Sequence, residues 1–310
     1  MNRLQSGQSL TNATWDDFWL NEGFTTYFER RILEAVYGTE RMEMDAQLGF
    51  TELQKALARA EPDDPDTRLK TELEGRGPDD GVGWIAYEKG YLFLRLIEEV
   101  VGRERWDAFL RGYFDTFAFQ PMTTERFVTY LRSELLDSDP SLDEAIGVKT
   151  WIHGVGIPDN KPEIRSDAFD KVAAVVDSWE GGVPAAELDT DGWTNQQWKE
   201  FVQRLPTPIS VEQMTELDRN FRFTNESNGE ILQVWFVKAI EVGYEPAYPA
   251  IEEYLTTIGR IWLISAVYRK LAETPEGLVR AREIYETAKT GYHPMTVGVI
   301  DRILTTDGEG

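Results

Sequence analysis

Residues 14–30 read TWDDFWLNEGFTTYFER, the pattern of a helix with a carboxylate on its aromatic face. At helical spacing, Glu22 shares a face with Phe18 and Trp19 before it and with Glu29 after it. Burying an unpaired carboxylate is costly, so we expect Glu22 to find a cation, a hydrogen-bond donor or a metal ion. The plainer alternative is a glutamate at the edge of the stripe that pairs with an arginine.

The Trp-Leu-Asn-Glu-Gly-Phe core of this stretch resembles the zinc-site helix of the gluzincin aminopeptidases, the family of aminopeptidase N and leukotriene-A4 hydrolase. The resemblance implies that Glu22 is a zinc ligand and that Glu29 is a further carboxylate that orients a ligand histidine. In that family the other two zinc ligands are the histidines of a His-Glu-x-x-His helix. The glutamate of that helix is the general base.

The sequence contains no His-Glu-x-x-His motif, and the position of the family's second ligand histidine falls on Arg3. The only histidines are His153 and His293, and neither has a partner at the i, i+4 spacing of a helical zinc pair. We read His153 as a packing residue of a loop. We therefore expect that two zinc ligands and the general base lie upstream of Met1, and that this chain alone is inactive or weakly active.

A second motif, Tyr87-Glu88-Lys89-Gly90, opens an apolar helical run. It resembles the family's second signature, in which the tyrosine donates a hydrogen bond to the oxyanion of the tetrahedral intermediate, so the resemblance implies this role for Tyr87. Taken by itself, Tyr87 would be an ordinary amphipathic tyrosine at a helix start. The two signatures occur in the family's order, which favours the catalytic interpretation.

Two further residues follow from the resemblance. Asp79 resembles the loop aspartate that leukotriene-A4 hydrolase uses to open an epoxide, although Val82 stands where that enzyme has a tyrosine; the alternative is a turn or cap residue. Arg260 resembles the arginine presented to the substrate carboxylate, a task that suits a guanidinium. Trp262 replaces the lysine two residues further on, and an arginine paired with a local acid is equally compatible with the sequence.

The hydrophobic periodicity predicts a mainly α protein. Residues 1–158 are expected to form the helical, C-terminal part of a thermolysin-like catalytic domain, and residues 159–165 to form a linker. Residues 166–310 are expected to form an all-helical, solenoid-like C-terminal domain, because eight amphipathic segments follow one another there with short loops. Residues 61–81, rich in Pro, Gly and Asp, indicate a long loop before the second motif.

The composition excludes several classes of partner. A net charge of -23 argues against nucleic acid and anionic membranes, and no apolar run is long enough to span a membrane. The absence of cysteine excludes disulfides and thiolate ligands. We expect a soluble protein, with the cytoplasm favoured, that acts on a peptide or small molecule; the oligomeric state is left open.

Three functions are compatible with the sequence. The first is a fragment of a zinc aminopeptidase that hydrolyses N-terminal residues from peptides. The second is a non-catalytic helical scaffold or interaction protein derived from such an enzyme. The third is a metal-free hydrolase of small esters or epoxides that uses Asp79, Glu22 and Tyr87. Zinc content separates the first from the other two.

Overall fold

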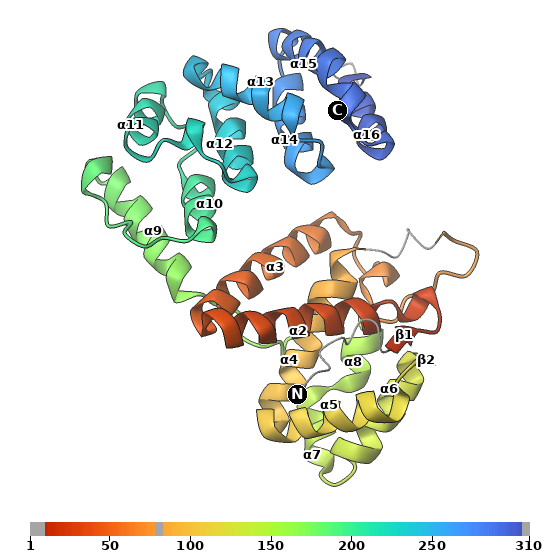
Figure 1. Ribbon diagram of the computed structural model, residues 1–310. Coiled ribbons are helices and arrows are strands. Elements are labelled where there is room, and N and C mark those ends of the chain that lie inside the picture. The colour runs from red at the N-terminus through yellow and green to blue at the C-terminus, as the bar shows by residue number, and fades with distance from the viewer. Residues whose placement is uncertain (1–9, 78–82, 306–310) are drawn as a thin grey trace. The chain divides into compact units, whose positions relative to one another are not determined.

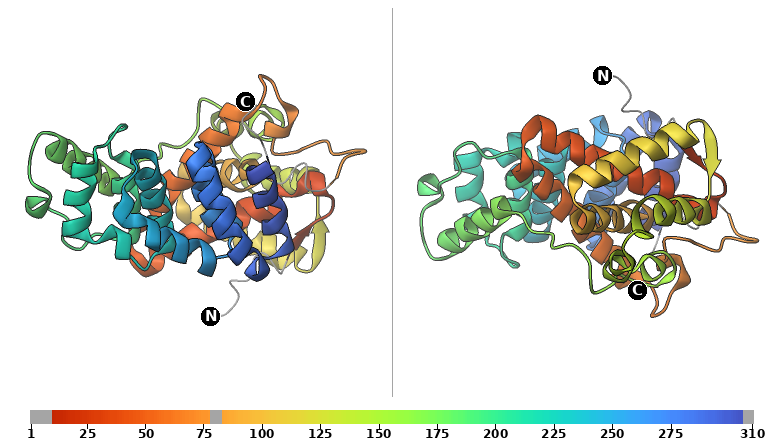
Figure 2. Two further views of the ribbon diagram at one scale, coloured as in Figure 1. Left: turned by 90° about the horizontal axis from the view of Figure 1, so that it is seen from above. Right: turned by 90° about the horizontal axis from the view of Figure 1, so that it is seen from below.

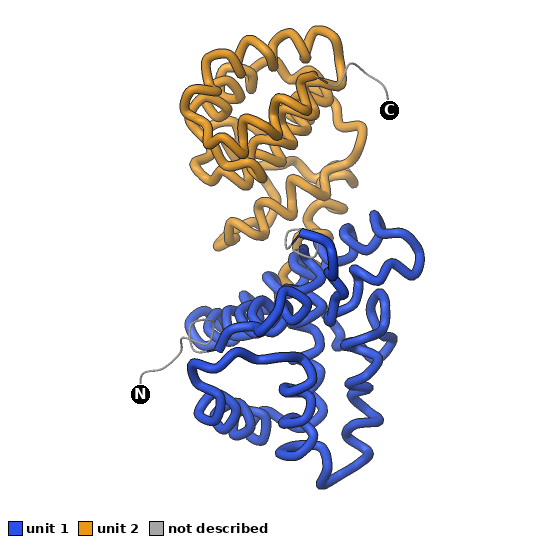
Figure 3. Tube along the Cα trace, turned by 90° about the vertical axis from the view of Figure 1, so that its right-hand side faces the viewer, with its two compact units in different colours: residues 1–166 blue, residues 167–310 orange. Residues whose placement is uncertain are grey.

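The computed structural model describes residues 10–77 and 83–305. The chain divides into two compact units, residues 1–166 and 167–310 (Figure 3). Each unit has its own hydrophobic core, so each can be understood by itself. Helices dominate both units, and the predicted mainly α fold is confirmed.

The described part of the first unit consists of helices and one short strand pair (Figure 1). In chain order the elements are β1 (Leu10–Asn12), η1 (Trp15–Asp17), α2 (Trp19–Tyr37), α3 (Thr39–Arg59), η2 (Pro65–Thr67), the π-helix η4 (Ile85–Lys89), α4 (Gly90–Val101), α5 (Arg103–Phe117), β2 (Gln120–Met122), α6 (Thr124–Leu131), the π-helix η5 (Arg132–Leu136), α7 (Pro140–Ile146) and α8 (Val148–His153). Helix α2 is central because it packs against α3, α4 and η4.

The start of α2 differs from the sequence expectation. The pattern places Asp17 in the first turn of one continuous helix, with Thr14 or Asn12 as its cap, whereas η1 comes first and α2 begins only at Trp19. The reason is that Asp17 is fully buried and serves a tertiary network. Its carboxylate accepts from Lys70 Nζ at 2.6 Å, from the backbone N and Oγ1 of Thr124 at 2.9 and 2.8 Å, and from Thr14 Oγ1 at 2.7 Å.

Residues 10–12 form strand β1 and pair in parallel with β2. The register places Leu10 opposite Gln120 and Asn12 opposite Met122. Asn21 ties this strand to α2, because its Oδ1 accepts a hydrogen bond from the backbone N of Asn12 at 3.1 Å. Strand β1 therefore leads the chain directly to the turn of α2 that carries Glu22.

The second unit contains every helix that the periodicity predicts (Figures 1 and 2). Its elements are α9 (Asp167–Glu180), η6 (Ala185–Glu187), α10 (Asn195–Arg204), α11 (Val211–Phe221), η7 (Phe223–Asn225), α12 (Gly229–Val242), η8 (Glu245–Ala247), α13 (Tyr248–Thr257), α14 (Ile261–Ala272), α15 (Pro275–Ala288), η9 (Lys289–Gly291) and α16 (Pro294–Thr305). Capping boxes start α10 and α11, with Thr194 and Ser210 as the cap residues.

The helices of this unit contact the next helix but one. Helix α10 packs on α12, α12 on α14 and α14 on α16, while α13 packs on α15. Consecutive hairpins thus stack in register and build two layers, as in a helical solenoid. The predicted solenoid-like arrangement is confirmed, and its core contains the buried aromatic residues Phe201, Trp235 and Tyr268.

Candidate functional site

The candidate site is built on the first turns of α2. Trp19, Leu20 and Phe24 point into the core of the first unit, which leaves Glu22 half-buried at the margin of this apolar face. The helix is anchored deep in the unit because Trp19 Nε1 donates to Thr124 Oγ1 at 3.0 Å. The aromatic residues of the motif thus fix the helix, and the glutamate is held where solvent and a ligand can reach it.

Two glycines set the distance between the two sequence motifs. A methyl group added to Gly23 would lie 2.9 Å from the Cα of Gly90, and one added to Gly90 would lie 2.7 Å from the Cα of Gly23. Both distances are shorter than any van der Waals contact, so only glycine at both positions lets α2 cross the start of α4 at backbone contact. Glu22 precedes Gly23, and Tyr87 lies one turn before Gly90, so the crossing brings their side chains together.

The hydroxyl of Tyr87 lies near enough to the carboxylate of Glu22 for each group to shift the pKa of the other. Burial raises the pKa of Glu22, and the nearby hydroxyl of Tyr87 offsets only part of that rise. Burial also raises the pKa of Tyr87, and the nearby charge of Glu22 raises it further. The ring of Phe18 packs edge-on against Tyr87, with centroids 6.1 Å apart. The phenol is thus held as a neutral hydrogen-bond donor beside a carboxylate.

Tyr87 lies inside the π-helix η4. A π-turn inserts one extra residue into a helix and re-aims the side chains around it, and such turns are frequent at functional sites. The two residues that follow Tyr87 are charged and buried. Lys89 Nζ donates to the backbone oxygens of Thr67 and Gly154 at 2.8 and 2.7 Å, and burial lowers the pKa of Lys89 to about 7. Lys89 thereby fastens the π-turn to two other segments of the unit.

A zinc ion would find one fitting ligand in this site. Glu22 is a half-buried carboxylate, and within residues 10–77 and 83–305 no lysine or arginine forms an ion pair with it. A lone carboxylate of this kind suits a metal ligand. However, the described residues contain no group of three or more potential metal ligands. Zinc therefore fits Glu22 alone and not a complete ligand set, so we derive no reaction step through a metal.

Among the described residues, neither histidine belongs to a group of potential metal ligands. His153 ends α8 and is exposed, so the expectation that it packs inside a loop is wrong. His293 belongs to the second unit, where it is also exposed and its Nδ1 accepts from the backbone N of Met295 at 3.2 Å.

The remaining predicted residues are more scattered. Glu29 is exposed, two turns after Glu22 on α2. Burial raises the pKa of Glu88, the charge of Arg30 lowers it in part, and the charge of Glu29 raises it further. Arg260 is exposed at the N-cap of α14 in the second unit, two residues before the half-exposed Trp262. Asp79, Val82 and Arg3 lie outside the described residues.

Sequence reasoning missed Gly23, Gly90, Lys89 and the buried pair of Arg30 and Glu88. The available signal was a glutamate and a lysine side by side in the otherwise apolar run from Ala86 to Leu94. Charged residues in such a run are rarely buried without partners. The run therefore indicated partners on other elements, although the sequence does not say which.

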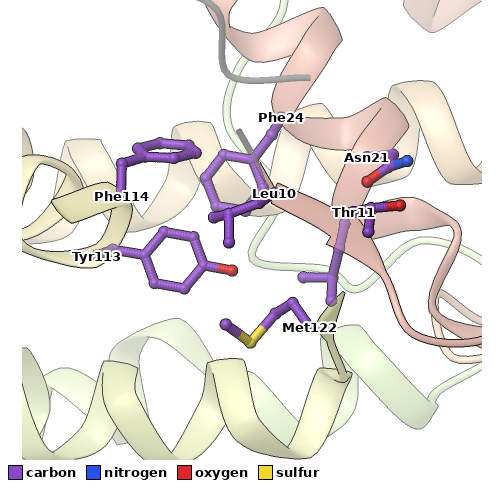
Figure 4. A pocket seen from close by; sticks show the side chains of 8 residues that line it. Leu10, Thr11, Asn21, Phe24, Tyr113, Phe114 and Met122 are labelled. Carbon is purple, nitrogen blue, oxygen red and sulfur yellow. The ribbon is translucent and has the colours of Figure 1, made fainter. Parts of the chain in front are cut away.

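The cavity closest to the site in sequence is too small for a substrate. It lies between β1, α2, α5 and β2 and has a volume of about 10 Å³, the room of one water molecule (Figure 4). Thr11 and Asn21 lie on one side of it, and apolar and aromatic side chains close the rest. A larger cavity of about 210 Å³ in the same unit is lined by Tyr27, Arg30, Tyr91 and Arg95 among others, and neither Glu22 nor Tyr87 lines it.

Comparison with known proteins finds two matching family models. The model of the peptidase family M1 domain matches residues 5–151, and that of the leukotriene A4 hydrolase C-terminal domain matches residues 193–304. Together they cover most of the chain, including the segment with Glu22 and Tyr87. The chain is therefore similar to peptidases of family M1 that carry a leukotriene A4 hydrolase C-terminal domain.

Individual relatives agree with this similarity. Leucine aminopeptidase 2 of Sclerotinia sclerotiorum is 32% identical to the chain over 310 residues, covering 96% of the chain and 50% of that protein. The leukotriene A-4 hydrolase homolog of Botryotinia fuckeliana is 31% identical, covering 96% and 47%. The structure of yeast LTA4 hydrolase in complex with bestatin matches with a TM-score of 0.86 at 24% identity, over 97% of this chain and 52% of that one, which supports the fold. The chain spans about half the length of the curated relatives it matches.

Proposed function

We propose that Glu22 and Tyr87 are two parts of the active site of a zinc aminopeptidase, which removes N-terminal residues from peptides. The observation that carries this proposal is the proximity of Tyr87 and Glu22, which the backbone contact of Gly23 with Gly90 brings about. It joins the two motifs that the family uses for its third zinc ligand and its oxyanion donor, although they lie on different helices. The match of residues 5–151 to the family M1 model supports the same interpretation.

The residues of this chain would divide the work as follows. Zinc, when bound, polarises the scissile carbonyl and lowers the pKa of water. Glu22 would hold the metal from one side, and Tyr87 would turn its hydroxyl from Glu22 to the oxygen on which negative charge develops. Glu29 would orient a ligand histidine, Arg260 would bind a substrate carboxylate, and Asp79 would act in the catalytic loop.

We further propose that these 310 residues alone turn over peptide weakly or not at all. The chain has only two histidines, and the structure gives Glu22 no second ligand among the described residues. An assembled site of the family's type needs the two imidazoles and the general base of a His-Glu-x-x-His motif, which this sequence does not contain. Among the described residues, no helix is long and apolar enough to cross a membrane.

The test has two arms. In the first, the chain is purified with and without added zinc, and zinc content by atomic emission is compared with hydrolysis of an aminoacyl fluorogenic substrate. We expect far less than one zinc per chain and no turnover above background. Near-stoichiometric zinc with chelator-sensitive turnover would show that other ligands complete the site, and the proposal of a weakly active chain would be wrong.

The second arm supplies the missing ligands. The N-terminal half of the Botryotinia fuckeliana homolog is joined to this chain, which aligns with 47% of that protein. We expect this chimera to bind zinc and to hydrolyse the substrate, and Glu22→Gln to lose both. The matched control is Glu43→Gln, on α3, which removes a carboxylate that pairs with Arg95 instead. A Glu22→Gln chimera with full zinc content would reject Glu22 as the ligand.

A further inference from the structure

The residue after Tyr87 takes part in a buried ion pair that the proposed chemistry does not use. The guanidinium of Arg30 on α2 donates two parallel hydrogen bonds to the carboxylate of Glu88, at 2.8 and 2.9 Å. Both side chains are only 6% exposed. Arg30 also lies over the ring of Tyr91 at 4.0 Å and donates to the backbone oxygen of Asp45 at 3.1 Å. The guanidinium of Arg30 is thus held by a carboxylate, an aromatic ring and a backbone oxygen.

A third helix makes room for this pair. A methyl group added to Gly49 of α3 would lie 2.2 Å from a guanidinium nitrogen of Arg30 and 2.4 Å from a carboxylate oxygen of Glu88. Only a glycine lets α3 approach so closely while both charged ends stay in place. Arg30, Glu88 and Gly49 therefore form one packed unit in which α2, the π-turn and α3 meet.

Stability alone is a weak reason for such a pair. Taking both charges out of water costs several kcal/mol per ion, and replacing a buried ion pair by apolar residues is often neutral or stabilising. The pair instead fixes the relative orientation of its two side chains, because a guanidinium and a carboxylate joined by two hydrogen bonds lie in one plane. The question is which geometry the pair fixes.

The pair lies away from the closest approach of the two helices. Gly23 and Gly90 set that approach, and the ring of Trp19 packs on Phe93 beside it, but these are non-directional contacts, whereas a forked ion pair has a fixed orientation. Arg30 follows Glu22 by two turns of α2, about 12 Å along the axis at 1.5 Å per residue. Glu88 directly follows Tyr87 in the π-turn. The pair therefore adds a second, distant attachment between the same two elements, and two separated attachments define an angle.

We propose that the Arg30–Glu88 pair is a positioning element that holds the hydroxyl of Tyr87 against Glu22 by fixing the angle between α2 and the π-turn. The catalytic meaning of this arrangement rests on the function proposed above, but the arrangement itself is a property of the folded chain. It can therefore be tested without zinc or substrate.

The experiment follows the ring of Tyr87 directly in the whole chain. The protein is labelled with 3-fluorotyrosine, and the ¹⁹F resonance that disappears in Tyr87→Phe is assigned to Tyr87. Glu22→Ala then gives the position of this resonance when Glu22 no longer holds the hydroxyl. We expect Glu88→Gln and Gly49→Ala to move the Tyr87 resonance at least half of the way to that position. Gly49→Ala is included because it disturbs the pair from α3, far in sequence from Tyr87.

The matched control is Glu43→Gln. It breaks a similar forked pair, in which Arg95 on α4 donates to Glu43 on α3 at 3.0 and 3.2 Å, and it should leave the Tyr87 resonance in place. Thermal unfolding of each variant is measured alongside. If Glu88→Gln and Gly49→Ala lower the melting temperature but leave the Tyr87 resonance where it was, or if neither variant folds, the pair serves the fold alone and the inference is wrong.

The experiment distinguishes a failure of the positioning role from a failure of the proposed aminopeptidase function. If Glu22→Ala itself fails to move the Tyr87 resonance, Glu22 does not hold Tyr87 and the positioning role falls, whatever the zinc content of the chimera. If the chimera binds no zinc while Glu88→Gln and Gly49→Ala both release Tyr87, the positioning role stands and the aminopeptidase assignment of Glu22 is the part that fails.

Discussion

At the scale of single residues, the hydroxyl of Tyr87 is the group whose removal should matter most for chemistry. It is a neutral donor beside Glu22, and a preorganised donor aimed at a developing oxyanion contributes to the transition state more than to the ground state. In the active chimera, we expect Tyr87→Phe to lower kcat by about 10²–10³-fold with KM nearly unchanged. Steady-state kinetics measure both constants.

The control for this substitution is Tyr130→Phe. Tyr130 is also a half-buried tyrosine of the first unit, but it packs against Phe109 and Phe117, away from Glu22. Its loss should leave kcat within about twofold, since a substitution away from special features changes little. Equal kcat values for Tyr87→Phe and Tyr130→Phe would show that Tyr87 is not the oxyanion donor.

Asp17 is a fully buried carboxylate of the first unit whose loss should lower the free energy of unfolding. Burial alone would raise the pKa of Asp17, but hydrogen bonds from Lys70, Thr14 and Thr124 together lower it below the ordinary 3.8. Asp17→Asn removes the charge from this network, and we expect a loss of about 1–3 kcal/mol at pH 7. Asp66, whose pair with Arg76 lies at the surface, is the control, and Asp66→Asn should cost about 0–1 kcal/mol.

The contribution of Asp17 to the free energy of unfolding should depend on pH. Because the pKa of folded Asp17 lies below its unfolded value, its contribution is fully present above about pH 3.8 and is lost as the pH falls through the folded value. Urea unfolding of the parent and of Asp17→Asn should therefore converge at low pH. A stability difference that stays constant down to the acid transition would contradict the assigned network.

At the scale of elements, the crossing of α2 and α4 should be sensitive to one methyl group. Gly23→Ala would place its Cβ 2.9 Å from Gly90 Cα and 3.1 Å from Gly90 C, and backbone atoms cannot turn away as a side chain can. We expect a net loss of about 1–3 kcal/mol in urea unfolding, even though alanine favours a helix. Gly112→Ala on α5 is the control, because its Cβ meets only the hydroxyl of Tyr130, at 2.9 Å. A Gly23→Ala protein as stable as Gly112→Ala would show that the helices do not touch there.

The same crossing shows where sequence reasoning ends. The helices were predictable because apolar residues recur at helical spacing, and the end of α2 followed from Gly38, which takes a positive φ of 89° at its C-cap. Glu22 and Tyr87 were predictable as site residues only through motifs. Strand β1 was not, since three residues give no alternation and its partner β2 lies more than a hundred residues away. Likewise, the contact of Gly23 with Gly90 and the pairing of Arg30 with Glu88 depend on tertiary packing that local pattern does not encode.

At the scale of the whole molecule, the two units should behave as separate cooperative units. The core of residues 167–310 is built entirely from residues of that unit, among them Val172, Trp235 and Leu304. Its length is that of a normal domain. We therefore expect residues 167–310, expressed alone, to be helical by circular dichroism and to melt cooperatively within a few degrees of one transition of the whole chain.

A shorter fragment of the second unit tests how its stacked helices stabilise one another. In a solenoid each helix pair is stabilised mainly by its neighbours, so the free energy of unfolding is close to a sum of local terms. A fragment that starts at Gly229 keeps the packing of α12 on α14 and α14 on α16 but loses that of α10 on α12. It leaves Trp235 and Phe236 without part of their cover, and exposing large buried side chains costs about 1.5–3 kcal/mol each. The shorter fragment should therefore melt at a clearly lower temperature than residues 167–310, and equal melting temperatures would contradict stability that is summed over stacked neighbours.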